Sequence, residues 1–423
     1  MSFAQTYLER YASGSCADLK PPDPDLFFSV VIPVFNESHL LDCLESLKAS
    51  HAGGLPAEII LVINHPDGAL PDAIEQNRKS QLEVAQWLAN ETPTKLTVHI
   101  LSPPAFSKSK AGPGLARRIG MDMAIRRFNQ IKRSDGVIVS MDADTLVDKN
   151  YFSALENLFK TRRQANTCTV FFEHLRSYGG KIIRDIQAMT EYEIYLRMVK
   201  IGLRWAGYPL GIYTLGSAFA VRASAYVKAG GMGVQQSGED FYFLHKSIQL
   251  GGFWENNDAR VYPAGRESDR VLFGTGPFIR DYQKQFPQGY KKYSWKAFLD
   301  LSEFFKRIAE IAYPTNESEI NKLIDTLEDP VLDQLKWKQK LLKALNQSGN
   351  ARSFTKWIWR ELDGLQIIKY LNLHQELFGA QFVVQTSCQL LSELGYTSCP
   401  QNLILVLNAL RKIERELGVV EVY

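Results

Sequence analysis

Two aspartates, Asp142 and Asp144, lie shortly after the apolar run of residues 137–139 in the segment GVIVSMDADTLVD. A β-branched run of this kind indicates a strand buried on both faces. Because side chains alternate along extended backbone, we expect both carboxylates to point to the same side. Adjacent carboxylates repel each other unless a divalent cation lies between them. The pair therefore predicts a metal site at the end of a strand.

The same Asp-x-Asp pattern occurs a second time, as Asp23-Pro24-Asp25. This copy lies in a Pro-rich segment before any predicted strand, where both carboxylates are expected to be solvated. The spacing alone is therefore a weak signal. The position at the end of a buried strand is what favours the metal site.

A second acidic pair, Glu239-Asp240, follows Gly238 at the start of a predicted helix. Acidic residues are common in a first helical turn because the helix dipole favours them, which is the structural alternative. The functional hypothesis is that a carboxylate partly buried against the aromatic run 241–243 holds its proton tightly and serves as a general base.

Two cationic segments are candidates for binding phosphate. Lys108 and Lys110 precede a Gly-rich turn and a predicted helix, whose free N–H groups favour anions. Arg266 and Arg270 lie in a Gly-rich loop near the end of the α/β region, and arginine forks suit phosphate oxygens. The alternatives are a solvated basic loop for the lysines and ion pairs with neighbouring acidic residues for the arginines.

The elements that must position these residues alternate between strands and helices. Buried-strand patterns occur at residues 27–35, 58–64, 95–101, 136–140, 167–174 and 213–221, with one more strand in 260–276. Such alternation predicts an α/β fold with a doubly wound, mostly parallel sheet and helices on both faces. In such a sheet ligands collect at the carboxyl ends of the strands.

The sequence divides into three parts by pattern. We expect residues 1–25 to form an N-terminal arm, residues 26–285 the α/β domain, and residues 286–423 a helical extension, because glycine becomes sparse and the pattern helical after about residue 290. A long helix is predicted over 181–203, with Glu193 and Arg197 forming a surface salt bridge on it.

Composition and charge restrict the function classes. The formal net charge of +3 gives no field of the kind that nucleic-acid binders use. Five scattered cysteines without a C-x-x-C pair argue against a disulfide framework and a structural zinc site, and favour a reducing compartment. Neither a secretory h-region nor a long apolar window occurs, so we expect a cytoplasmic protein.

One stretch of the C-terminal part leaves room for contact with the inner face of a membrane. The segment FTKWIWRELDGLQIIKYL mixes tryptophans with basic residues, a combination that suits a membrane surface. Burial of these aromatic side chains in a core is the alternative.

Several pieces, taken in order, resemble the family 2 glycosyltransferases, enzymes of the GT-A fold. They cover about residues 27–276 and read VVIPVFNES, GPGLARRIGMDMA, MDADT, LGSAFAVR and GEDFYFLHK. The resemblance implies that Pro33, Phe35, Asn36 and Glu37 contact the donor nucleotide together with Arg117. It implies that Asp142 and Asp144 bind the metal that carries the donor diphosphate, and that Glu239 and Asp240 lie at the acceptor, with Asp240 as the base.

The chain departs from the family pattern at two places. Residues 64–68 read Asn-His-Pro-Asp-Gly where the family carries D-D-G-S, so Asn64 is left to read the base of the nucleotide. The segment RVYPAGRESDR lacks the histidine that often completes the metal shell. The implied ion is therefore Mg²⁺ or Mn²⁺, held largely by diphosphate and water.

The implied activity is transfer of a sugar from a nucleoside-diphosphate sugar to a saccharide or lipid-linked acceptor, with inversion. In that reaction Lys110, Arg266 and Arg270 would assist the diphosphate. A non-catalytic nucleotide-sugar-binding or scaffold protein remains an alternative. A sugar nucleotidyltransferase or a Rossmann dehydrogenase is disfavoured, because no Gly-rich signature follows the first strand.

Overall fold

The computed structural model describes residues 2–12, 19–51, 54–90, 95–175, 177–178, 181–182, 185–267, 274–311, 313–314, 316–400 and 402–423. The chain forms two compact units. The first, here called the sheet unit, comprises Met1–Ile186, Thr214–Asp281 and Glu414–Tyr423. The second, the helical unit, comprises Gln187–Tyr213 and Tyr282–Ile413.

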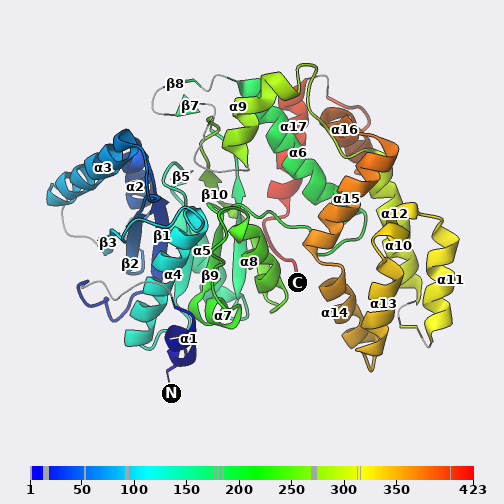
Figure 1. Ribbon diagram of the computed structural model, residues 1–423, viewed down its shortest axis with the longest axis horizontal. Coiled ribbons are helices and arrows are strands. Elements are labelled where there is room, and N and C mark those ends of the chain that lie inside the picture. The colour runs from blue at the N-terminus through cyan, green and yellow to red at the C-terminus, as the bar shows by residue number, and fades with distance from the viewer. Residues whose placement is uncertain are drawn as a thin grey trace. The chain divides into compact units, whose positions relative to one another are not determined.

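The sheet unit is built on one mixed sheet of nine strands (Figure 1). Its strands run in the order β13-β10-β6-β9-β4-β1-β2-β3, and β5 pairs with β10. They are β1 (Phe28–Val34), β2 (Ala57–Ile63), β3 (Leu96–Leu101), β4 (Val137–Ser140), β5 (Leu146–Val147), β6 (Thr167–Phe172), β9 (Phe219–Arg222), β10 (Phe253–Tyr262) and β13 (Val419–Glu421). A separate hairpin joins β7 (Ser177–Tyr178) and β8 (Lys181–Ile182).

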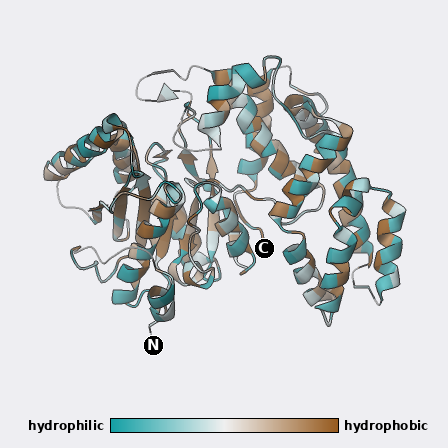
Figure 2. Cartoon of the chain, in the orientation of Figure 1, coloured by the Kyte–Doolittle hydropathy of each residue, from teal (hydrophilic) through white to brown (hydrophobic). Residues whose placement is uncertain are grey.

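The centre of this sheet is parallel. β1 pairs in parallel with β2 and β4, and β2 pairs in parallel with β3, whereas β9 runs antiparallel to both of its neighbours. Every residue of β2 and β4 is buried, as expected of strands covered on both faces. Figure 2 shows these strands in brown, flanked by helices of mixed colour. The predicted α/β fold with a mostly parallel sheet is confirmed.

Helices cover the two faces of the sheet. α4 (Pro113–Gln130) packs on β1 and β2, whereas α2 (Leu40–Ser50) contacts α5 (Tyr151–Thr161), which packs on β10. Gly120 permits the close approach of α4, because a Cβ there would overlap the side chains of Val31 and Val62. The remaining helices of the unit are α1 (Gln5–Arg10), α3 (Pro71–Ala89), α7 (Ala223–Lys228) and α8 (Glu239–Ile248), and α9 (Thr275–Gln285) begins in it.

The helical unit consists of packed helices and one short strand pair. Its elements are α6 (Ile186–Trp205), β11 (Lys291–Lys292), α10 (Trp295–Ile311), α11 (Glu317–Leu327), α12 (Pro330–Gln334), α13 (Trp337–Asn346), α14 (Ala351–Glu361), α15 (Gly364–Phe378), β12 (Gln381–Phe382), α16 (Val383–Glu393) and α17 (Leu403–Glu416). The predicted helical character of the C-terminal region is confirmed.

The expected surface salt bridge between Glu193 and Arg197 is instead fully buried. Both side chains have 0% exposure, and the Arg197 Nη2 lies 2.8 Å from the Glu193 Oε1. Arg411 of α17 donates to both oxygens of the same carboxylate, at 2.7 and 2.9 Å. Burial of an ion pair requires compensating hydrogen bonds, and here Arg411 supplies them. The i, i+4 spacing of Glu193 and Arg197 does not reveal this long-range partner.

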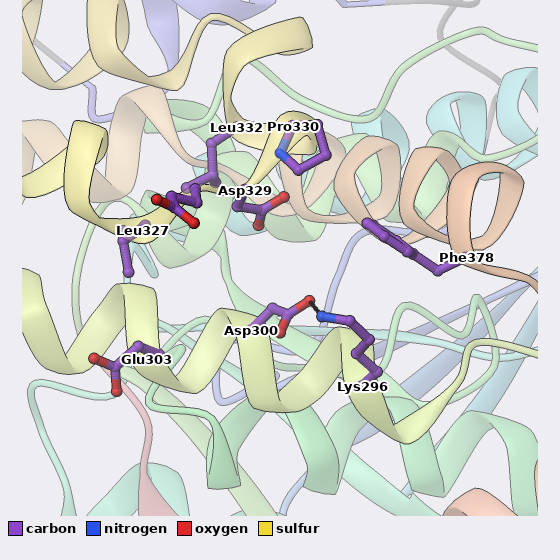
Figure 3. Close-up of a pocket in the computed structure, with 9 residues that line it drawn as sticks. Lys296, Asp300, Glu303, Leu327, Asp329, Pro330, Leu332 and Phe378 are labelled. Atoms are coloured by element: carbon purple, nitrogen blue, oxygen red, sulfur yellow. Dashed lines mark hydrogen bonds and ion pairs between the residues drawn. The ribbon is translucent and has the colours of Figure 1, made fainter.

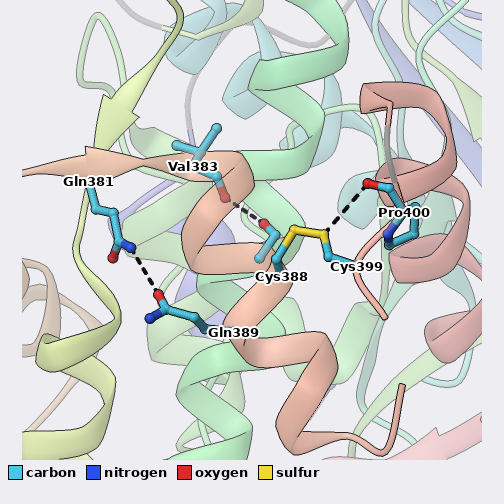
Figure 4. Close-up of a disulfide and its surroundings, with 7 residues drawn as sticks. Gln381, Val383, Cys388, Gln389, Cys399 and Pro400 are labelled. Atoms are coloured by element: carbon cyan, nitrogen blue, oxygen red, sulfur yellow. Dashed lines mark hydrogen bonds between the residues drawn. A yellow bond between two sulfur atoms is a disulfide. The ribbon is translucent and has the colours of Figure 1, made fainter. Parts of the chain in front are cut away.

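The cysteine prediction is also corrected. Cys388 on α16 forms a disulfide with Cys399, eleven residues further along the chain (Figure 4). Cys43 and Cys168, by contrast, are buried free thiols. The lack of a recognisable cysteine motif concealed the bond, because pairing depends on the approach of two Cα atoms, here 5.1 Å apart, and not on a sequence motif.

The chain divides differently from the expected three parts. The predicted arm contains α1, whose Tyr7 hydroxyl donates to the buried carboxylate of Asp122 on α4 at 2.6 Å. The last strand, β13, returns to the sheet and pairs with β10, and residues 187–213 belong to the helical unit. Among the described residues, no helix has both the length and the apolar character to cross a membrane.

Candidate functional site

The polar residues predicted for the site follow the ends of three neighbouring parallel strands. Val34 at the end of β1 lies opposite Ile63 at the end of β2, and Val31 of β1 lies opposite Ser140 at the end of β4. Glu37, Asn64 and the aspartates 142 and 144 therefore emerge at one edge of the sheet. This is the carboxyl edge, where α/β folds bind ligands.

Asp142 and Asp144 lie in a turn and not in extended backbone. β4 ends at Ser140, and the Thr145 N–H donates to the Asp142 carbonyl oxygen at 3.1 Å. Strand alternation therefore does not orient the two carboxylates. Asp142 forms an ion pair with Arg117, whereas Asp144 forms one with Arg266.

Arg117 of α4 connects two carboxylates from distant parts of the chain. Its side chain is 4% exposed and pairs with both Asp142 and Glu239. Gly216 lies against its guanidinium, where any Cβ would overlap it. Burial lowers the pKa of Arg117, but Asp142 and Glu239 outweigh this effect and raise it, so the group remains charged.

Arg266 forms the second bridge. Its Nη2 contacts the Asp144 Oδ2 at 3.0 Å and also the Oε2 of Glu37, which is fully buried. Two carboxylate oxygens thus converge on one cationic nitrogen. The other predicted loop arginine, Arg270, lies outside the described residues.

Asp240 is the titratable group of the site whose pKa is shifted towards neutrality. α8 begins at Glu239, after Gly238 in the left-handed conformation with φ 75°, and the Asp240 Oδ1 accepts a hydrogen bond from the Phe241 N–H at 2.7 Å. Burial raises the pKa of Asp240 to about 7, and repulsion from Glu239 adds to the shift, while Arg117 opposes it. The aspartate can therefore exchange a proton near neutral pH.

The ends of β1 and β2 are linked by hydrogen bonds of two asparagines, Asn64 and Asn77. Pro33 lies within β1, Phe35 follows it, and Asn36 has the left-handed φ of 50°. The Asn36 N–H donates to the Asn77 side chain at 2.8 Å. The Asn64 amide donates to the carbonyl oxygens of Val34 and Val62, which leaves its Oδ1 as the group that could face a base.

The turn before α4 is closely packed by another segment. A Cβ added to Gly112 would overlap the backbone carbonyl group of Gln236, and one added to Gly114 would overlap that of Gln235. Lys110, which precedes this turn, is exposed. The contact with residues 235–236 was not anticipated, although the run G-P-G signals a backbone that another chain segment approaches closely.

Cys43 of α2, which no sequence motif singled out, lies next to the turn that carries Asp142 and Asp144. The Cys43 thiol of α2 donates to the Asp142 carbonyl oxygen at 3.7 Å. Burial raises the pKa of this thiol, and the nearby carboxylates of Asp144 and Asp142 raise it further, so it remains protonated. Its role is to support the turn.

The donor set at this edge is suited to a hard cation that is shared with a ligand. Among the residues that the structure describes, no group of three or more His, Cys, Asp or Glu side chains could hold a metal ion unaided. The oxygens of Glu37 and Asp144 nevertheless converge on the position of one cation, the Arg266 guanidinium. In many enzymes Mg²⁺ is bound by one or two carboxylates, and substrate phosphates supply further ligands.

A separate small cavity of about 110 Å³ lies within the helical unit (Figure 3). Its wall includes Asp300 and Lys296 of α10, whose side chains are 2.5 Å apart, together with Asp329, Pro330 and Phe378. The acidic groups here are engaged by protein partners: Asp300 contacts His374 at 3.0 Å, and Asp329 accepts from the Tyr370 hydroxyl at 2.6 Å. The predicted catalytic groups lie in the other unit.

Comparison with known proteins gives matches among solved structures alone. Neither a protein-family model nor a curated protein matches the sequence. S. aureus TarS 1–349 in complex with UDP-GlcNAc has a TM-score of 0.38 and 13% identity, over 92% of this chain and 91% of that one. The same protein alone gives 0.38 and 14%, over 80% and 91%.

Another match is glucosyl-3-phosphoglycerate synthase from Mycobacterium tuberculosis, in complex with Mn²⁺, UDP-glucose and phosphoglyceric acid. It has a TM-score of 0.31 and 14% identity, over 55% of this chain and 69% of that one. TM-scores and identities of this size carry no weight for function. Evidence for a function must therefore come from the residues of the site.

Proposed function

We propose that the chain is a metal-dependent glycosyltransferase that moves a sugar from a nucleoside-diphosphate sugar to an acceptor hydroxyl, with inversion, in glycan or polysaccharide assembly. The observation that carries the proposal is the cluster at the carboxyl edge of the sheet. There Arg117 and Arg266 join carboxylates that follow β1 and β4 and one at the start of α8. Asp240, with a pKa of about 7, follows directly in the chain.

The charges of this cluster suit a donor that brings both phosphate and a cation. Five carboxyl groups, on Glu37, Asp142, Asp144, Glu239 and Asp240, stand against two guanidinium groups. A diphosphate alone would be repelled by this excess of negative charge. When the diphosphate is accompanied by its cation, diphosphate oxygens would replace the carboxylates that contact Arg266. The planar guanidinium of Arg266 matches the geometry of phosphate.

Asp142 and Asp144, with Glu37, are the residues that would hold Mg²⁺ or Mn²⁺. Such an ion supplies positive charge that stabilises the diphosphate leaving group. Arg117 keeps Asp142 and Glu239 in place, because its buried guanidinium is bonded to both. Lys110 is exposed and could reach the same diphosphate.

Asp240 would act as the base. Its Oδ1 is occupied by the Phe241 N–H, which leaves Oδ2 to accept the proton of the acceptor hydroxyl. The hydroxyl oxygen then forms its bond to the anomeric carbon while the bond from that carbon to the diphosphate oxygen breaks on the opposite face. A single displacement of this kind inverts the configuration.

A binding experiment and a transfer assay test the proposal together. Thermal unfolding is measured with UDP, GDP, CMP or NAD, each with and without Mn²⁺. We expect stabilisation by one nucleoside diphosphate that requires Mn²⁺, and release of that diphosphate from the matching sugar donor. Binding without any transfer to a range of acceptors would instead support a nucleotide-sugar-binding protein, and no response to any nucleotide would contradict both.

The chain contains its own matched control for the aspartate pair. Asp142→Asn with Asp144→Asn should abolish the Mn²⁺-dependent stabilisation. The same double change at Asp23 and Asp25, an exposed Asp-x-Asp in a turn, should leave it intact. Equal responses of the two double variants would remove the metal assignment.

A further inference from the structure

Basic residues are strongly concentrated in one stretch of the helical unit. Residues 336–360 contain no aspartate or glutamate, although 46 of the 423 residues of the chain are acidic. The basic residues of the stretch are Lys336, Lys338, Lys340, Lys343, Arg352, Lys356 and Arg360. With a net charge of only +3 for the whole chain, the remaining residues together are net negative.

The stretch folds as two contacting helices, α13 and α14, here called the basic hairpin (Figure 1). Its apolar side chains face the core: Trp337 is fully buried against Phe304 and Tyr370, and Phe354 and Ile358 of α14 are buried as well. The apolar face is thus already occupied, and the charges are left on the outside.

The charges on α14 form a row. Arg352, Lys356 and Arg360 are spaced by four residues, which places them on one face of the helix, and all three are exposed. Within the described residues, neither Arg352 nor Lys356 has an acidic group within ion-pair distance, and the Arg360 guanidinium lies over the ring of the half-buried Trp357 at 4.5 Å.

Two of the α13 lysines are locally neutralised. Lys338 contacts Asp325 at 3.2 Å, and Lys343 contacts Glu361 at 2.6 Å. Among the described residues, no comparable ion pair is formed by Arg352, Lys356 or Arg360 of α14. The positive charges of the α14 row repel one another, but this repulsion costs little folding free energy because solvent screens it.

We propose that the basic hairpin docks on the surface of an anionic phospholipid membrane through the outer face of α14. A row of long cationic side chains along one helix matches a flat layer of phosphate groups, whereas a soluble phosphate ligand would need a pocket, and the cavity described above is lined by other residues. Trp357 beside Arg360 provides an aromatic ring at the level of the headgroups. This inference does not depend on the proposed transferase activity.

Vesicle sedimentation tests the docking. The full chain is mixed with vesicles of phosphatidylcholine alone, or with about a third of phosphatidylglycerol, where each basic residue near the surface should strengthen binding roughly fivefold. We expect sedimentation with the anionic vesicles alone, and its loss at about 1 M salt, where screening is nearly complete. No sedimentation with anionic vesicles would overturn the proposal.

Matched variants locate the binding surface. Arg352→Gln, Lys356→Gln and Arg360→Gln together should weaken binding to anionic vesicles about a hundredfold. The control changes three exposed basic residues elsewhere: Arg163→Gln, Lys228→Gln and Lys322→Gln. It removes the same charge and should bind like the unchanged chain.

Thermal unfolding of both triple variants checks that they are folded, which is expected because all six side chains are exposed. Equal losses in the two variants would show a general charge effect and overturn the proposal. Binding to soluble polyphosphate together with a failure to bind vesicles would also overturn it, in favour of a soluble polyanion.

Discussion

At the scale of single residues, Asp240 combines a shifted pKa with a position beside the arginine-linked cluster. Burial raises its pKa to about 7, with Glu239 adding to the shift. A base must be deprotonated to act, so kcat/KM should fall about tenfold for each pH unit below this value. Asp240→Asn should reduce transfer about 10²–10⁴-fold while the nucleoside diphosphate still binds. Full transfer by this variant would exclude Asp240 as the base.

The same pKa has a consequence for stability that is independent of activity. The folded carboxyl group holds its proton up to about pH 7, whereas the unfolded one loses it near its ordinary value. The group therefore costs stability increasingly as pH rises between these two values. Asp240→Asn should raise the free energy of unfolding more at pH 8 than at pH 4, as measured by urea unfolding. An equal effect at both pH values would contradict the shift.

Arg266 is expected to compete with a divalent ion for Glu37 and Asp144. It contacts both carboxylates, so Arg266→Gln should strengthen the binding of Mn²⁺ to the ligand-free chain, roughly tenfold. The same change should weaken the binding of nucleoside diphosphate in the presence of Mn²⁺. Both affinities can be measured by calorimetry. Arg260→Gln, which removes contacts to Asp148 and Glu173, is the control and should change neither.

At the scale of elements, the position of Arg117 depends on how closely α4 packs on the sheet. A Cβ on Gly120 would overlap Val31 and Val62, so Gly120→Ala should push the helix outward and lower the free energy of unfolding by about 1–2 kcal/mol. Nucleotide binding should weaken as well, because Arg117 lies on the same helix. Gly349→Ala, where a Cβ meets open space, should leave stability and binding unchanged. A destabilised Gly349→Ala would indicate a general glycine effect.

The disulfide of the helical unit predicts a thiol count. Cys388 and Cys399 are bonded, so the denatured, unreduced chain should show two thiols fewer than the reduced chain. Titration with a thiol reagent under denaturing conditions measures the difference. Equal counts would mean that the bond does not form. Cys388→Ser offers a control, because it should remove the difference between the two counts.

Elements with a strong apolar pattern could be predicted from the sequence, and those with polar buried strands could not. The runs at β1, β2 and β4 contain Val and Ile almost throughout, so their burial was evident. β10 reads FWENNDARVY, and Glu255 and Asn256 are buried in it. The side chain of Asn256 donates to the Ala154 carbonyl oxygen, a long-range hydrogen bond that permits burial of the amide.

The same limit applies to the site. The residue types and strand ends pointed to the carboxylates and to Arg117, which the structure brings together through ion pairs. The sequence did not reveal that Arg266 links Glu37 to Asp144, nor that Gly112 and Gly114 pack against residues 235–236. These contacts join positions more than a hundred residues apart, and no local pattern encodes them.

At the scale of the whole molecule, the chain passes between the two units four times, so neither unit is one continuous segment. Charges distant in sequence are joined within each unit: Arg411 contacts Glu193 in the helical unit, and Arg415 lies 3.9 Å from Glu173 in the sheet unit. A truncation near residue 285 would therefore remove residues from both units. The boundary near residue 285 that the sequence pattern favours is therefore a poor place to divide the protein.

The last strand provides the sharpest test of this organisation. β13 pairs with β10: the Phe253 N–H donates to the Tyr423 carbonyl oxygen at 2.9 Å, and the Val422 N–H donates to the Phe253 carbonyl oxygen at 2.8 Å. Deleting residues 419–423 removes these bonds and leaves an open strand edge. We expect stability to fall by about 2–4 kcal/mol, with aggregation through the exposed edge.

Urea unfolding and light scattering measure the two effects. Glu421→Ala keeps the backbone of β13 while changing an exposed side chain, so it should behave like the unchanged chain. The fragment 1–285 should fare worse than the deletion, because it lacks β13 and also most of the helical unit, including Arg411, which donates to both oxygens of the buried Glu193 carboxylate. A fragment that is monomeric and as stable as the full chain would show that residues 1–285 fold on their own.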